Sequence, residues 1–199
     1  MSVSIEMVKE LREVTGAGVL DAKKALMAAD GDFDAAVDAL RKKGLARAAK
    51  RADREANEGI VELYTHPGNR LGVMLELNCE TDFVARNEMF VNLAHDLALH
   101  IAALAPRYLH IEDVPQDDLD RELDILRAQA LSEGKPEHIV EKIVTGRMKK
   151  FYEETVLMEQ PFVKDGSKKV KNLIEDAKMS TGENVMLRRF ERYELGESL

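Results

Sequence analysis

The chain has 199 residues, of which 45% are hydrophobic and 33% charged, and its formal net charge is −8. This length allows one domain or two small ones, and the composition supports a buried core, which argues against a chain that is disordered throughout. The negative charge disfavours a general attraction to nucleic acid or anionic membranes, and the 5% of aromatic residues, without Trp, offers little surface for base stacking.

The cysteine content and the N-terminal residues indicate the compartment. Cys79 is the only cysteine, so no internal disulfide can form and a secreted disulfide scaffold is excluded. The N-terminal residues hold no apolar run flanked by basic residues, and no stretch of 18 apolar residues occurs in the chain. We therefore expect no signal peptide, no membrane span and a cytoplasmic protein.

Residues 1–45 predict a small bundle of three helices. Ser4 can cap the first helix, and the glycine-containing segment at residues 15–18 ends it. Asp32 can cap the third helix, for which Gly44 is the expected end. Each helix has apolar residues on one face, so these residues can form a domain of their own.

Residues 46–57 are rich in Ala, Lys and Arg and carry no wide apolar face, which predicts a linker. A solvated connector is one interpretation of this basic segment, and contact with nucleic acid is the other. The absence of aromatic partners for the cations disfavours the second. The cationic side chains are Arg47, Lys50, Arg51 and Arg54.

The periodicity of the apolar residues changes at Gly59, where strand patterns first occur. Two β-rich runs, 59–65 and 71–78, flank the sequence His66-Pro67-Gly68-Asn69, which predicts a hairpin. Residues 184–193 alternate as a final strand, and residues 87–105 carry the strongest helical stripe of apolar residues. We expect residues 58–199 to form an α+β core in which a three-stranded antiparallel sheet packs on helices.

A helical coiled-coil hairpin is expected as an insertion in this core, at residues 115–155. Its first arm has apolar residues at coiled-coil spacing. Gly134 can close this arm, and Pro136 can open the second. So narrow an apolar seam predicts an arm that projects from the domain and lies outside its core.

No pattern in the chain indicates an enzyme. The glycines at 16 and 18 lie near Lys23 and Lys24, but they follow no strand and lack the rest of a phosphate-binding loop, so a turn between helices is expected. The five histidines do not cluster with Cys79 at metal-ligand spacing, and no nucleophile motif is present. We expect no catalytic residue, no metal and no cofactor.

The segment at residues 78–84, NCETDFV, joins the second strand to the long helix. Phe83 does not fall on the apolar stripe that begins at Phe90, so it need not belong to the core. In one interpretation Phe83, beside an acidic residue, is displayed as a wedge against a partner. In the other, Thr81 or Asp82 caps a helical turn and Phe83 staples that turn to the sheet. The residues alone favour the second interpretation.

Several motifs in the same order resemble the elongation factor Ts family over nearly the whole chain. They are VKELREVTGAGVLDAKKAL at residues 8–26, LELNCETDFVA at 75–85, GKP at 134–136 with GRMKKF at 146–151, and QPFV at 160–163. The resemblance implies a ubiquitin-associated-like (UBA-like) three-helix domain, a linker and a core that carries the hairpin. It also implies a guanine-nucleotide exchange factor, which binds elongation factor Tu with GDP, displaces Mg²⁺ and promotes GDP release so that GTP can bind during translation elongation.

The same resemblance assigns residues to the contact with elongation factor Tu. It ties the segment around Phe83 to the displacement of Mg²⁺, with Phe83 pushed between side chains of the partner's switch region. It also implies contacts of the N-terminal domain and of one histidine with the GTPase domain. The residues that inherit the first role are Thr81, Asp82, Phe83 and Val84, and those that inherit the second are Leu11, Arg12 and His100.

Longer members of the family carry two related half-modules in the core, whereas residues 55–199 contain one. The resemblance implies that short members pair, so we expect a homodimer, with an edge strand such as residues 184–193 at its interface. The functional alternative is a UBA-type protein-binding adaptor without exchange activity. Such an adaptor would leave the rate of GDP release from elongation factor Tu unchanged. Direct binding to nucleic acid or to a membrane is not expected.

Overall fold

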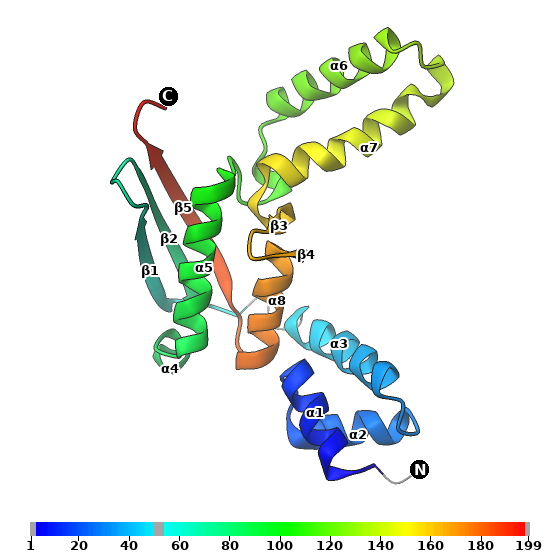
Figure 1. Ribbon diagram of the computed structural model, residues 1–199, viewed down its shortest axis with the longest axis vertical. Coiled ribbons are helices and arrows are strands. Elements are labelled where there is room, and N and C mark those ends of the chain that lie inside the picture. Colours follow the sequence, from blue (N-terminus) through cyan, green and yellow to red (C-terminus); the bar gives the residue numbers. More distant parts are fainter. Residues whose placement is uncertain (1–2, 50–53, 198–199) are drawn as a thin grey trace. The chain divides into compact units, whose positions relative to one another are not determined.

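The structure is a computed structural model that describes the backbone of residues 3–49 and 54–197, and the side chains of residues 3–44 and 54–197 (Figure 1). Contacts between residues divide it into two compact units. The first contains the described residues up to Ile60, Leu77–Val91 and Ile174–Leu187. The second contains Val61–Glu76, Asn92–Leu173 and the described residues from Arg188 onward.

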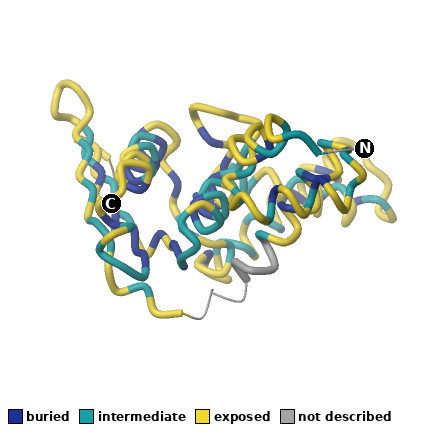
Figure 2. The backbone as a smooth tube through the Cα atoms, turned by 90° about the horizontal axis from the view of Figure 1, so that it is seen from below, coloured by how far each residue is buried: buried dark blue, intermediate teal, exposed yellow. Residues whose placement is uncertain are grey.

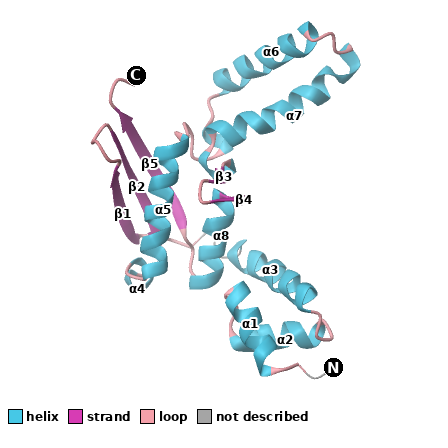
Figure 3. Ribbon diagram, in the orientation of Figure 1, coloured by secondary structure: helices cyan, strands magenta, loops and turns pink. Residues whose placement is uncertain are grey.

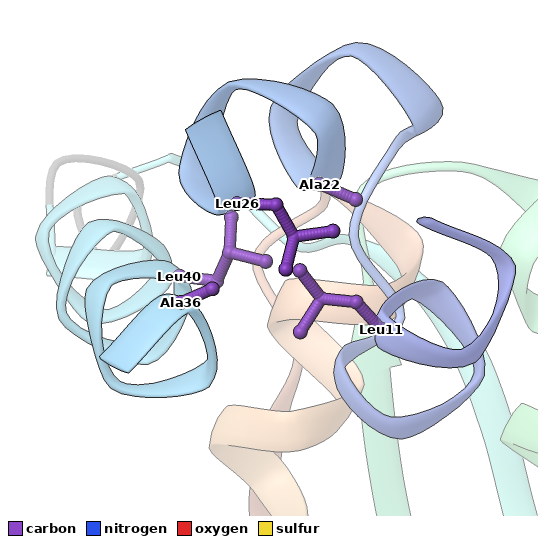
Figure 4. Packing of buried hydrophobic residues seen from close by; sticks show 5 residues of the cluster. All are labelled: Leu11, Ala22, Leu26, Ala36 and Leu40. Atoms are coloured by element: carbon purple, nitrogen blue, oxygen red, sulfur yellow. The ribbon is translucent and has the colours of Figure 1, made fainter. Parts of the chain in front are cut away.

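The N-terminal part of the first unit is the predicted three-helix bundle, formed by α1 (Ile5–Thr15), α2 (Val19–Ala28) and α3 (Phe33–Ala49). Ser4 caps α1, because its hydroxyl accepts a hydrogen bond of 3.1 Å from the amide of Met7. Asp32 caps α3 in the same way, by accepting from the amide of Ala35 at 3.0 Å. The side chains that meet in its core are Leu11, Ala22, Leu26, Ala36 and Leu40 (Figure 4).

Helix α3 continues past its predicted end. Gly44 was expected to stop the helix, but α3 extends to Ala49, so that prediction is wrong. Gly44 has no positive φ, and the following Leu-Ala-Arg-Ala-Ala sequence favours a helix, which offsets the cost of about 1 kcal/mol for one glycine. The limits of the linker at residues 46–57 stay a prediction, since Lys50 and Arg51 lie outside the described residues.

The predicted antiparallel sheet consists of β1 (Glu58–Thr65), β2 (Leu71–Cys79) and β5 (Met186–Glu194), in the order β1-β2-β5 (Figure 3). Between β1 and β2, the amide of His66 donates to the carbonyl of Leu71 at 2.9 Å, which closes the expected hairpin. β1 and β5 are therefore the two edges of the sheet. The alternation expected for β2 is present: its buried side chains include Val73, Leu75, Leu77 and Cys79.

Two further helices are α5 (Glu88–Leu104) and α8 (Val170–Thr181) (Figure 1). The predicted stripe of α5 is largely buried, whereas Leu104 at its end is 40% exposed. The short helix α4 (Asp82–Ala85) precedes α5. The buried residues of the α5 stripe are Phe90, Ala94, Leu97 and Ile101.

The predicted helical hairpin is present in the second unit, as α6 (Gln116–Ser132) and α7 (Glu137–Thr155). Arg127 pairs with Glu141 at 2.8 Å, and Arg147 with Glu133 at 2.8 Å, so ion pairs join the two helices. Each pair is solvent-exposed and contributes little, about 0–1 kcal/mol, so the apolar contacts hold the hairpin together. Its core consists of Leu126, Ala130, Val140, Val144 and Met148.

A second small sheet was not predicted. β3 (Pro161–Phe162) pairs antiparallel with β4 (Asp165–Lys169), whereas the sequence DGSKK shows no alternation of apolar residues. Residues 163 and 164 form the turn between the two strands, and within β4 a carboxylate oxygen of Asp165 accepts from the amide and the hydroxyl of Ser167 at 3.1 and 2.6 Å. Single 3₁₀ turns cover Ile111–Asp113 and Leu157–Glu159.

Buried residues, dark blue in Figure 2, occur in the bundle, the sheet and the hairpin alike. Each part therefore has apolar contacts of its own. Within the described part of the chain, no helix combines the length and the apolar character needed to cross a bilayer.

The same substitution at two glycines is expected to have opposite effects. Gly59 in β1 has a φ of 145°, and a Cβ there would lie 2.1 Å from the carbonyl oxygen of Leu77. Gly59→Ala should therefore lower the free energy of unfolding by about 1–3 kcal/mol. Gly146 in α7 faces open space, so Gly146→Ala should raise that free energy by about 0.5–1 kcal/mol. Urea unfolding curves test both, and a loss of stability in both variants would contradict this explanation.

Candidate partner-binding site

The segment singled out in the sequence leaves the sheet at the end of β2 and forms the single turn of α4. Thr81 is the N-cap of this turn, with extended backbone (φ −130°, ψ 153°). Its hydroxyl accepts a hydrogen bond of 3.4 Å from the amide of Val84. Thr81 therefore caps the turn, as one of the two interpretations required.

Phe83 is displayed to solvent. Its side chain is 83% exposed, the highest value among the large apolar residues of the described chain. The second half of the capping interpretation, in which Phe83 staples the turn to the sheet, is therefore wrong. An aromatic side chain that gains nothing from its own fold keeps its full apolar area for a partner.

Of the residues next to Phe83 in the sequence, one is partly exposed and two are at least half-buried. The carboxylate of Asp82 pairs with Arg86 at 2.8 Å and is 45% exposed. Val84 is half-buried, and Ala85 is buried at 6% exposure. The turn thus presents Asp82 and Phe83 outward and is anchored by the two residues that follow.

Hydrogen bonds from the loop after α8 hold this segment. Oε2 of Glu183 accepts from the amides of Glu80 and Thr81, each at 3.1 Å, and its Oε1 accepts from the Thr81 hydroxyl at 2.6 Å. In return, Oε1 of Glu80 accepts from the amide of Asn184 at 2.7 Å. Bonds to an ionised carboxylate are stronger than bonds between neutral groups. Glu183 was not identified from the sequence, because 102 residues separate it from Thr81 and no local pattern marks it.

Cys79 lies beneath the segment. It is fully buried, and its Sγ donates to the carbonyl of Thr81 at 3.2 Å. Burial, together with the negative charge of Glu183, raises the pKa of Cys79 to about 11. The thiol is therefore protonated at neutral pH and acts as a donor to the segment.

His100, which was expected to contact a partner, is fully buried on α5 in the second unit. Its Nε2 lies 3.0 Å from Oε1 of Gln160, and its Nδ1 accepts from the amide of Val163 at 3.1 Å. An accepting Nδ1 places the proton on Nε2, so the ring is neutral, and burial lowers the pKa of His100. His100 thus fixes residues 160–163, and a direct contact with a partner would require that segment to move.

The two remaining predicted contact residues differ in exposure. Leu11 is fully buried in the core of the bundle, whereas its neighbour Arg12 is exposed. Both lie on α1, so they are not part of the segment around Phe83. Among the described residues, no three His, Cys, Asp or Glu side chains are grouped so that they could hold a metal ion.

Comparisons with known proteins identify the family. Residues 33–197 match the family model described as Elongation factor TS. The chain is 55% identical to Elongation factor Ts of Herpetosiphon aurantiacus over 198 residues, which cover 100% of both chains. The chain belongs to the elongation factor Ts family.

Two further relatives carry the same name. The Desulforamulus reducens protein is 56% identical over 197 residues, 99% of this chain and 91% of the relative. The Moorella thermoacetica protein is 56% identical over 192 residues, 96% and 95% of the two chains. A likeness of this extent covers both the N-terminal bundle and the core.

Family membership confirms the expected activity. The protein is the nucleotide exchange factor for elongation factor Tu in translation elongation, it acts in the cytoplasm, and it is not an enzyme. The alternative of a UBA-type adaptor without exchange activity is therefore set aside. An exchange factor makes and breaks no covalent bond, so its site consists of the groups that contact the partner.

The buried His100 predicts a pH dependence of stability. Histidine in the unfolded chain has a pKa of about 6.5, and burial makes the pKa of His100 lower in the folded protein. Between these two pKa values the unfolded chain binds more protons, so the free energy of unfolding should fall as the pH decreases below about 6.5. Urea unfolding between about pH 7.5 and pH 5 measures this slope.

A variant without the titrating group isolates this contribution. His100→Gln should be less stable at neutral pH but should lose less stability over the same acidic range. His138→Gln, which replaces an exposed histidine on α7, should keep the slope of the parent protein. Equal slopes in all three proteins would show that the pKa of His100 is the same in the folded protein and in the unfolded chain.

Proposed function

We propose that residues 81–84 perform the exchange by entering the nucleotide site of elongation factor Tu and displacing its Mg²⁺. GTPases hold GDP largely through Mg²⁺ and through backbone contacts to the phosphates. Without the metal, the negative charge of the phosphates is poorly compensated, and the affinity for GDP falls. The observation that supports this proposal is the 83% exposure of Phe83 on a turn held by hydrogen bonds.

Each residue of the segment has a role in this proposal. Phe83 inserts between side chains of the switch region of elongation factor Tu, where burial of a phenyl ring contributes about 1.5–3 kcal/mol. Asp82 contacts the same region with its exposed carboxylate. Thr81 fixes the start of the turn, and the half-buried Val84 anchors its end.

The proposal also includes contacts outside this segment. Arg12, exposed on α1, contacts the GTPase domain of elongation factor Tu. Leu11 and His100 are buried, so their proposed contribution is indirect. Leu11 holds the bundle that carries Arg12, and His100 holds residues 160–163 in place.

Thermodynamic coupling explains why such a factor is released again. If the factor weakens the binding of GDP, GDP must weaken the binding of the factor by the same ratio. The factor therefore binds nucleotide-free elongation factor Tu best. It leaves when GTP enters, and no covalent step is needed.

We further propose that the protein acts as a homodimer, because residues 55–199 supply one core module. Val61 and Leu63 on the edge strand β1 are 60% and 70% exposed, and Met74 on the adjacent β2 is 47% exposed. Tyr64 and Glu62, which alternate with them, contact His95 of α5, so Val61 and Leu63 point away from that helix. Apolar residues exposed on neighbouring strands are suited to a second copy of the chain.

Phe83→Ala should slow the release of GDP from elongation factor Tu by about tenfold or more, since a buried aromatic anchor commonly contributes about 2 kcal/mol or more to an interface. The exposed position of Phe83 means that the variant should fold normally. Release of fluorescent GDP, followed at several factor concentrations, measures the effect. Leu195→Ala, at a residue that is 65% exposed, is the matched control and should exchange normally. A folded Phe83→Ala variant with normal exchange would show that Phe83 is no wedge.

The dimer is tested by the mass of the protein in solution. Sedimentation equilibrium should give twice the mass of one chain, and Leu63→Lys should give the mass of one chain, because a buried unpaired ammonium opposes association. Leu20→Lys, at a residue of α2 that is 72% exposed, is the control and should stay dimeric. A parent protein that remains monomeric at about 100 µM, where even a weak specific dimer forms, would refute the proposal.

A further inference from the structure

We infer that Glu183 is a positioning residue for nucleotide exchange, whose carboxylate holds residues 80–84 in the conformation that displays Phe83. The inference rests on the proposed function of residues 81–84. Glu183 itself touches neither nucleotide nor metal in this scheme. It acts through the backbone of the segment that does.

The geometry of the carboxylate is suited to this role. Its Oε2 receives the amides of two successive residues, Glu80 and Thr81, and its Oε1 receives the hydroxyl that caps α4. These amides follow the end of β2, where strand pairing stops, and buried or half-buried amides require another acceptor. One side chain therefore fixes both the direction in which the chain leaves the sheet and the start of the turn.

Glu183 is in turn fixed from both sides. Before it, Gly182 has a left-handed φ of 74° after the end of α8, and the amide of Glu183 donates to the hydroxyl of Thr181 at 3.2 Å. After it, the buried Asn184 donates from its amide to Glu80 and from its side chain to the carbonyl of Arg54 at 2.8 Å. The carboxylate thus occupies its place before any partner binds.

Phe83 depends on such a support because it has almost no packing of its own. A side chain that is 83% exposed takes its direction from the backbone that carries it. Ordering a loose loop during association reduces affinity, because the lost conformational entropy offsets part of the favourable interaction with the partner. A segment that is already ordered avoids this loss, so Glu183 should affect how tightly the factor engages elongation factor Tu.

Cys79 provides a direct probe of the segment. It is the only cysteine, it is buried, and it donates to the carbonyl of Thr81. A thiol reagent reaches Sγ only when the segment opens, so the labelling rate reports the open population. The negative charge of Glu183 also contributes to the raised pKa of Cys79, so loss of that charge alone would make the thiol more reactive. A control for charge is therefore needed.

Glu183→Gln is that control. The carboxamide oxygen can accept from both amides, and its NH₂ group can donate to the Thr81 hydroxyl oxygen. Three hydrogen bonds to the segment are therefore possible, the one to Thr81 with its direction reversed, while the charge is lost. Glu183→Ala loses the hydrogen bonds of the side chain as well as its charge. Differences between these two variants therefore report the hydrogen bonds. Should Glu183→Ala fail to fold by its urea unfolding curve, Glu183→Asp, with a shorter side chain, takes its place.

The experiment compares the parent protein, Glu183→Gln, Glu183→Ala, Phe83→Ala and the double variant Phe83→Ala with Glu183→Ala. If the displayed conformation falls to about one tenth of the molecules in Glu183→Ala, the factor concentration for half-maximal GDP release should rise about tenfold, with the maximal rate nearly kept. Cys79 should label faster in Glu183→Ala than in Glu183→Gln, which should exchange like the parent. In the Phe83→Ala background, the added Glu183→Ala should change exchange by less than about twofold, because both substitutions act through one segment.

Three outcomes would overturn the inference. Equal labelling of Cys79 in Glu183→Ala and in a Glu183→Gln variant that exchanges like the parent would show that the hydrogen bonds of residue 183 do not hold the segment. If Glu183→Ala exchanged normally while Phe83→Ala was impaired, the hydrogen bonds of Glu183 to the segment would not matter for exchange. If Glu183→Ala reduced exchange by the same factor in the parent protein and in Phe83→Ala, Glu183 would act on exchange by a route that does not involve Phe83. Normal exchange by Phe83→Ala would instead overturn the proposed role of Phe83 in exchange. The labelling rates of Cys79 would still show whether Glu183 keeps residues 80–84 in place.

Discussion

Where β2 ends at Cys79, the chain has to leave the sheet and present an aromatic side chain without burying it. The carboxylate of Glu183 meets this constraint by accepting hydrogen bonds from both Glu80 and Thr81. The half-buried Val84 and the buried Ala85 anchor the same turn, and neither covers the ring of Phe83, which is 83% exposed. The rest of the site follows: Thr81 starts the turn, Ala85 anchors it, and the phenyl ring stays in solvent.

The two units contribute to the proposed function in different ways. The first contains the segment around Phe83 together with the bundle that carries Arg12. In the second, the neutral imidazole of His100 bonds to Gln160 and to the amide of Val163. Both sites use a buried or half-buried polar group that is fully hydrogen-bonded to set the path of a neighbouring loop. In both units, polar groups inside the protein therefore fix the path of a neighbouring loop.

Much of the fold could be predicted because periodicity is local. The stripe of α5 begins at Phe90, and β2 alternates from Val73 to Cys79, so both patterns are visible in a few residues. β4 could not be predicted, since its sequence, DGSKK, shows no alternation of apolar residues. The predicted end of α3 at Gly44 was wrong, because the high helix propensity of the residues that follow outweighed the cost of one glycine in the helix.

The site was only partly visible in the sequence, for a related reason. The position of Phe83 outside the α5 stripe showed that it need not be core, but exposure depends on what packs nearby in three dimensions. Glu183 is one of many acidic residues in the chain, and only the fold brings it to Thr81. The burial of His100 was equally hidden, because a histidine among apolar residues has no sequence pattern that distinguishes a core position from a contact surface.

The base of the hairpin has an evolutionary consequence. The amide of Arg107 donates to the carbonyl of Thr155 at 2.8 Å, and that of Leu157 donates to the carbonyl of Tyr108 at 2.8 Å. The chain therefore enters and leaves the α6–α7 hairpin at adjacent points, and the hairpin has a core of its own. Whole helical turns can be gained or lost at its tip while these junction bonds stay unchanged, so the arm can vary in length between lineages independently of the sheet.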